Sequence, residues 1–108
     1  MYTLDRQLQV LNEEVIGLAR TQYASYAQND PAYLDDLTAY FEESDRAWKA
    51  SRNADCALEP FMQGMSRPEA SDLTEACRVD RTKARISEMN KVKVTLKPVS
   101  CSAIRPIN

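Results

Sequence analysis

The chain has 108 residues, 28% charged and 44% hydrophobic, which is the balance of one small globular domain. It contains two glycines and no histidine. So few glycines argue against a many-turned β fold. The lack of histidine removes the usual general base, the catalytic triad and most metal-hydrolase sites. We therefore expect an all-α protein that is not an enzyme and carries no cofactor.

The net charge of −2 is unevenly distributed. Residues 1–59 carry eleven acidic and five basic side chains, a net charge of −6, whereas residues 60–108 carry a net charge of +4. An acidic face could steer a cationic partner, although a solvated helix surface is the simpler explanation. The basic half lacks the interleaved aromatic residues of a single-strand nucleic-acid binder. No stretch reaches the roughly 20 apolar residues of a membrane span, and the first residues lack a signal-peptide pattern, so an exported form would already have lost its signal.

A first helix is predicted from Leu4 to about Ala27. Its apolar residues recur at steps of three and four, which places them on one face: Leu4, Leu8, Leu11, Val15 and Leu18. So short a stripe is typical of a core face rather than of a dimer seam, so a monomer is expected.

A second helix is predicted from Pro31 to about Leu58, with Asp30 as its N-cap. Its inward stripe is expected to comprise Tyr33 or Leu34, Leu37, Tyr40 or Phe41, Ser44, Trp48 and Arg52. Because the connection is short, the first two helices should pack as an antiparallel hairpin.

Residues 59–68 are predicted to form a loop, and the spacing of Ser66 and Glu69 fits a capping box. A third helix should follow from Glu69 to Asn90. Its expected inward residues are Leu73, Ala76, Cys77, Asp80, Ala84 and Met89. Residues 91–97 alternate polar and apolar side chains, the period of a strand. The sequence therefore predicts a helical domain over residues 1–90 and an extended C-terminal arm over residues 91–108.

The three cysteines are irregularly spaced, with no C-x-x-C pair, so a zinc site is not expected. A bridge between Cys56 and Cys77 would fasten the third helix to the second and contribute about 3 kcal/mol in the chain-entropy model. The alternative is three buried free thiols in a cytosolic protein. If the bridge forms, Cys101 is the cysteine left over, and it would be free, linked to another chain, or separated from a partner upstream.

Three segments carry a family resemblance. Residues 45–56, with Trp48, Arg52 and Cys56, resemble the Q-R-A-W-x-x-[YF]-R-D-A-x-C hallmark of the LprI-type lysozyme inhibitor family. Residues 77–85 look like its C-x4-T-x2-R half, and Asp5 to Asn12 is similar to its D-x-x-L-N opening, with longer spacing. Asp45 and Ser51 depart from the hallmark, which bears on partner contacts more than on the fold. The likeness covers roughly residues 5–89.

The resemblance implies an exported bacterial protein, periplasmic or secreted, with the two motif cysteines joined and lysozyme as a protein partner. The alternatives are an envelope interaction module or a surface antigen with another partner. Motif residues Asn12, Trp48, Arg52, Thr82 and Arg85 also have structural interpretations.

Two sets of side-chain contacts are expected. Arg52 lies one helical turn from Trp48, so its guanidinium could rest against the indole or could pair with Glu88 of the third helix. The candidate partner-binding residues are Phe61, Met62 and Met65, which could equally tuck into the core.

Overall fold

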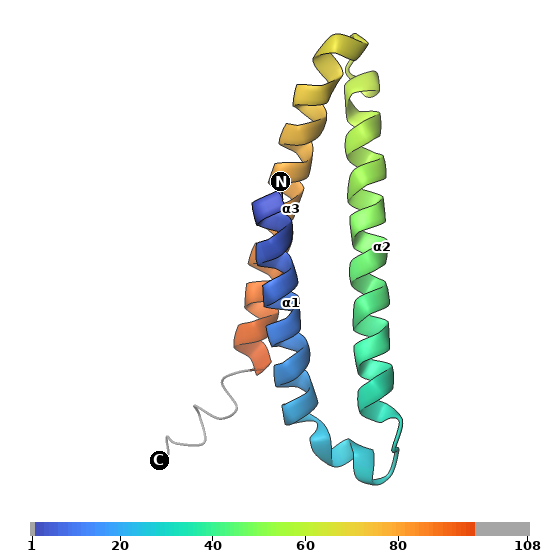
Figure 1. Ribbon diagram of the computed structural model, residues 1–108, viewed down its shortest axis with the longest axis vertical. Coiled ribbons are helices and arrows are strands. Elements are labelled where there is room, and N and C mark those ends of the chain that lie inside the picture. Colours follow the sequence, from blue (N-terminus) through green and yellow to red (C-terminus); the bar gives the residue numbers. More distant parts are fainter. Residues whose placement is uncertain (1, 97–108) are drawn as a thin grey trace.

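The computed structural model describes residues 2–96, and these residues form helices joined by short connections, without a strand. Helix α1 (Tyr2–Gln22) is followed by a 3-10 turn, η1 (Ala24–Gln28), and then by α2 (Tyr33–Met62) and α3 (Arg67–Leu96). Figure 1 shows an elongated arrangement in which α2 is antiparallel to the other two helices. Helices α1 and α3 are therefore parallel to each other. The molecule measures 59 × 33 × 21 Å along its principal axes. The all-α prediction is confirmed.

The core lies mainly between α1 and α3. Leu8, Leu11 and Val15 of α1 are buried together with Met89 of α3. Helix α2 adds only the partly buried Phe41 and Trp48. The first two helices are antiparallel, as predicted, but α1 packs far more extensively on α3 than on α2. Since α1 and α3 are distant in sequence, no local pattern indicated this pairing.

The connection between α1 and α2 is longer than predicted. Helix α1 ends at Gln22 rather than near Ala27, and α2 begins at Tyr33 without a side-chain cap from Asp30. Instead, the Asp30 carbonyl accepts a hydrogen bond from the Tyr33 backbone N–H at 2.9 Å, which closes a turn around Pro31. The predicted N-cap at Asp30 is therefore wrong by two residues.

Helix α2 continues past its predicted end to Met62 and contains Pro60. Because Pro60 lacks an N–H, it costs the helix one hydrogen bond, but its ring is fully buried and lies within the last turn. The helix then ends in a Schellman motif, with Gly64 N–H donating to Phe61 O and Met65 N–H to Pro60 O. Gly64 supplies the required positive φ of 71°. The predicted 59–68 loop is thus reduced to residues 63–66.

Ser66 and Glu69 form the predicted pairing at the start of α3. The Glu69 carboxylate accepts hydrogen bonds from the Ser66 hydroxyl at 2.7 Å and from its backbone N–H at 3.1 Å. These bonds, chiefly the one from the hydroxyl, hold the pKa of the Glu69 carboxyl below its usual value. The reciprocal half of a capping box is absent, because the Glu69 N–H donates to the Ser66 carbonyl instead.

Two expectations for the last helix are wrong. Ala76, Asp80 and Ala84 are exposed, and the buried residues of α3 are Cys77, Thr82 and Met89. Residues 91–96 continue α3 instead of forming an extended arm, since helical spacing from Met89 brings Leu96 onto the core. The third helix therefore ends six residues later than the predicted Asn90. The rest of the predicted arm, including Cys101, lies outside the described residues.

Some of the remaining predictions of inward-facing residues are confirmed and others are wrong. On α2, Phe41 faces the core while Ser44 and Tyr40 are exposed. On α1, Leu8, Leu11 and Val15 are buried as predicted.

Candidate functional site

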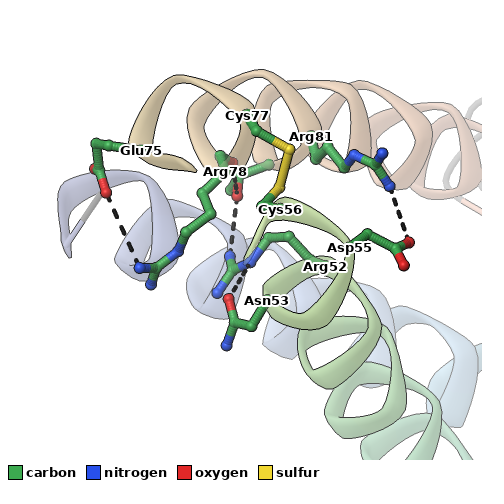
Figure 2. The surroundings of a disulfide bond; sticks show 9 residues. Arg52, Asn53, Asp55, Cys56, Glu75, Cys77, Arg78 and Arg81 are labelled. Atoms are coloured by element: carbon green, nitrogen blue, oxygen red, sulfur yellow. Dashed lines mark hydrogen bonds and ion pairs between the residues drawn. A yellow bond between two sulfur atoms is a disulfide. The ribbon is translucent and has the colours of Figure 1, made fainter. Parts of the chain in front are cut away.

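A disulfide joins Cys56 of α2 to Cys77 of α3, as predicted, with Cα atoms 5.5 Å apart. Figure 2 shows the bridge crossing between the two helices, with charged side chains on either side of it. One of these pairs, Arg81 of α3 and Asp55 of α2, lies 3.2 Å apart on the exposed side. The covalent bond and the ion pair hold α2 and α3 in register near the end where they connect.

Arg52 lies one turn before the bridge and is the most buried charge that the structure describes, with 3% of its surface exposed. Its Nη1 donates to the Asp5 carboxylate of α1 at 2.7 Å and to the Thr82 hydroxyl of α3 at 3.0 Å. Its Nε donates to the neighbouring Asn53 side chain at 3.1 Å. A buried guanidinium requires such pairing, because an unpaired buried charge is strongly destabilising. Arg52 therefore ties all three long helices together.

Two guanidinium groups lie near the Trp48 ring. The Cζ of Arg52 is 5.2 Å from the indole centroid, and the Cζ of Arg85 from α3 is 5.4 Å away. Both distances fall within the range of cation–π attraction. The predicted contact between Arg52 and Trp48 is confirmed, whereas Glu88 pairs with Arg85 at 3.6 Å instead of with Arg52. The predicted partner for Arg52 was wrong because Asp5 of α1 occupies that role.

Asn12 makes a side-chain hydrogen bond between α1 and α2. Its side-chain amide N–H donates to the Asp45 carboxylate at 2.9 Å, and Lys49 lies 3.1 Å from the same carboxylate. Asp45, where the family hallmark has Gln, is thus engaged within the molecule. Of the motif residues predicted from sequence, the structure gathers all five, Asn12, Trp48, Arg52, Thr82 and Arg85, along the surfaces where the helices meet.

A further set of contacts lies where α1 ends and α2 begins. Arg20 of α1 donates to the Leu34 carbonyl at 2.9 Å and to the Thr38 hydroxyl at 2.8 Å. Tyr26 of η1 packs edge-on against Tyr33, with ring centroids 5.0 Å apart. Sequence reasoning missed Arg20, which has no motif signal. Its position at the end of α1, directly before the tyrosine-rich connection, was the only available indication.

Comparison with known proteins bears on this network of contacts. The sequence model of the family described as lysozyme inhibitor LprI matches residues 2–89. The chain belongs to the LprI lysozyme inhibitor family. No curated protein and no solved structure matches the chain. The matched range contains the disulfide and every helix contact of the motif residues, so the family's hallmark in this chain coincides with its interhelical network.

Several exposed apolar side chains of this LprI-family protein gather at the tip where α2 turns into α3, the upper end in Figure 1, while others lie along the helices. We call this surface the apolar tip; it consists of Leu58, Phe61, Met62 and Met65. Met62 is 75% exposed, and the Arg67 guanidinium lies 5.6 Å from the Phe61 ring centroid. The three candidate partner-binding residues are therefore at the surface, on a turn whose base is closed by the disulfide.

None of the described helices of this LprI-family protein is long and apolar enough to cross a membrane. Among residues 2–96, no group of three or more Cys, Asp or Glu side chains is arranged to hold a metal ion. The described surface offers an apolar tip and the acidic side chains of α1 and α2, and both suit contact with another macromolecule.

Proposed function

We propose that this protein inhibits a lysozyme by binding it directly, outside the cytoplasm. The observation that carries the proposal is the family match, which spans residues 2–89 and so covers nearly all of the three-helix unit. The disulfide supports an extracytoplasmic site of action, because disulfides persist mainly in oxidising compartments. The acidic half of the chain supports a cationic partner such as lysozyme, since complementary charge speeds encounter.

The apolar tip is the proposed contact surface. Phe61 and Met62 lie on the last turn of α2, and Met65 follows in the tight turn. Exposed apolar groups on a rigid turn lose little conformational freedom on binding, which favours affinity. The Schellman motif and the bridge between Cys56 and Cys77 provide that rigidity.

The test is a lysozyme turnover assay on bacterial cell walls, titrated with the oxidised protein. The expected result is dose-dependent inhibition that the double variant Phe61→Ser/Met62→Ser weakens by roughly tenfold or more, as expected for hot-spot residues. Tyr40→Ser is the matched control, because Tyr40 is 76% exposed on the same helix but lies away from the tip. Circular dichroism verifies that both variants keep the helical fold.

Each failure has a distinct meaning. No inhibition by a folded, bridged sample at large molar excess would overturn the proposal for that lysozyme. It would direct attention to an envelope protein as the partner. Inhibition that the tip variant leaves unchanged would keep lysozyme as the target but remove the apolar tip as the contact surface.

A further inference from the structure

A cleft of about 350 Å³ lies between α1 and α2, away from the apolar tip. Three carboxylates, Glu13, Glu42 and Asp45, line it together with one cation, Lys49. Lys49 is already paired with Asp45. The cleft therefore carries a net charge of −2, and the charges of Glu13 and Glu42 are not balanced by any ion pair within the described residues.

Asn12 gives this cleft a feature that a solvated acidic surface lacks. The residue is only 7% exposed, yet it lines the cleft. Its amide nitrogen is used in the bond to Asp45, which fixes the other side-chain atom as the carbonyl oxygen. That oxygen is buried and accepts no hydrogen bond from residues 2–96. A buried acceptor without a donor is costly, and the great majority of such groups have a partner.

The group that would satisfy this cleft is a cationic hydrogen-bond donor. The described carboxylates are not arranged as a metal site. Phe41 forms part of the wall, so the occupant should also tolerate an aromatic neighbour. A guanidinium meets these requirements, because it presents five N–H donors in a plane, pairs with carboxylates and packs against aromatic rings.

We infer that the cleft between α1 and α2 is a socket for an arginine side chain of the protein partner. Asn12 Oδ1 accepts a hydrogen bond from the guanidinium, while Glu13 and Glu42 supply the compensating charge. The socket adds a second contact along α2, in addition to the apolar tip. It rests on the proposed function only in taking lysozyme as the protein that supplies the arginine.

The socket can be tested without lysozyme. Acetyl-arginine amide is titrated into the isotope-labelled protein, and the side-chain NH₂ resonances of Asn12 are followed by NMR. The expected result is a saturable shift at Asn12 and at the Glu42 backbone amide, which acetyl-glutamine amide does not produce. The double variant Glu13→Gln/Glu42→Gln should lose the shift and keep the fold, since both side chains are exposed. No localised shift, or an equal shift with the neutral compound, would overturn the inference and leave water as the occupant.

Lysozyme supplies the second measurement. The charge reversal Glu13→Lys/Glu42→Lys is expected to weaken lysozyme binding by roughly tenfold or more, because like charges then face the partner's arginine. Asp72→Lys/Asp80→Lys is the matched control, with the same change in net charge on exposed positions of α3. Equal losses in both variants would show a general charge effect and overturn the socket. If the wild type does not bind lysozyme at all, the proposed function fails, and the titration with acetyl-arginine amide alone decides the socket.

Discussion

The Thr82 hydroxyl links two helices through hydrogen bonds. It is fully buried, accepts a hydrogen bond from Arg52 Nη1 at 3.0 Å and donates one to the Arg78 carbonyl at 2.7 Å. The hydroxyl thereby connects α3 to a guanidinium that also holds Asp5 of α1. The hydroxyl oxygen accepts a hydrogen bond from a buried charge that water does not reach, and an apolar side chain could not supply this bond.

Thr82→Val is therefore expected to lower the free energy of unfolding by about 1–3 kcal/mol, since it keeps the shape and leaves a buried donor of Arg52 with one acceptor fewer. Thr95→Val is the control, because Thr95 makes the same hydroxyl-to-carbonyl bond within α3, to Lys91, but is exposed. Its effect should stay within about 0.5 kcal/mol. Urea unfolding of both variants provides the comparison, and equal values would contradict a special role for Thr82.

At the residue scale, the sequence identified the residues that hold the helices together, but not their partners on other helices. Arg52 and Trp48 were paired correctly, because positions four apart on a helix are neighbours in any fold. Arg52 and Asp5 are separated by most of α1 and α2, so their contact depends on how the helices pack. Glu88 was an acceptable partner on charge alone, but in the structure it pairs with Arg85 of its own helix.

The last six residues of α3 show how two periodicities can compete at the level of an element. Val92, Val94 and Leu96 alternate with polar residues as in a strand. In the helix, Leu96 packs against the core, while Val94 is 62% exposed. Lys93, on the inner side, reaches Glu14 of α1 at 3.2 Å. Tertiary contacts with α1 thus decide the conformation of a segment whose local pattern favours neither state strongly.

Leu96→Ser should destabilise the protein by about 1–2 kcal/mol, the loss expected for a partly buried leucine. Val94→Ser should change the free energy of unfolding by less than about 0.5 kcal/mol, as for other exposed positions. In a strand the two side chains would share one face and respond alike. Chemical denaturation of the pair distinguishes the two conformations, and equal losses would count against the helix.

The other helix boundaries also show that a local sequence pattern predicts some helix ends and misses others. Ser66 and Glu69 marked the start of α3 because the capping interaction is local. Pro60 predicted a loop, yet α2 continues through it, since burial of the ring stabilises a helix that the missing N–H weakens. Local bonds were thus predictable from sequence, whereas boundaries set by burial were not.

For the whole molecule, the small core makes the covalent link important. Within residues 2–96, four residues form the buried cluster between α1 and α3, and many large apolar side chains remain exposed. Helices α2 and α3 form a long pair held by Arg52, by Arg81 and by the bridge between Cys56 and Cys77. The all-α class and the bridge were predicted from sequence. The pairing of α1 with α3 was not, because periodicity shows which face is apolar but not which helix covers it.

Removing the bridge, by reduction or by Cys56→Ser/Cys77→Ser, should cost about 3 kcal/mol, the chain-entropy value for a loop of this length. The closed loop spans a sequence separation of 21 residues. Urea midpoints recorded with and without reductant measure the effect. The double serine variant is the internal control, because reductant should leave it unchanged. A wild-type midpoint insensitive to complete reduction would refute this estimate.

The pairing of α1 with α3 also sets when the chain can fold during its synthesis. Leu8, Leu11 and Val15 leave the ribosome long before Met89, the residue of α3 that covers them. A nascent chain that ends before α3 therefore presents an uncovered apolar stripe, the kind of surface that chaperones bind. This protein can complete its core only after nearly all of its helices have been made.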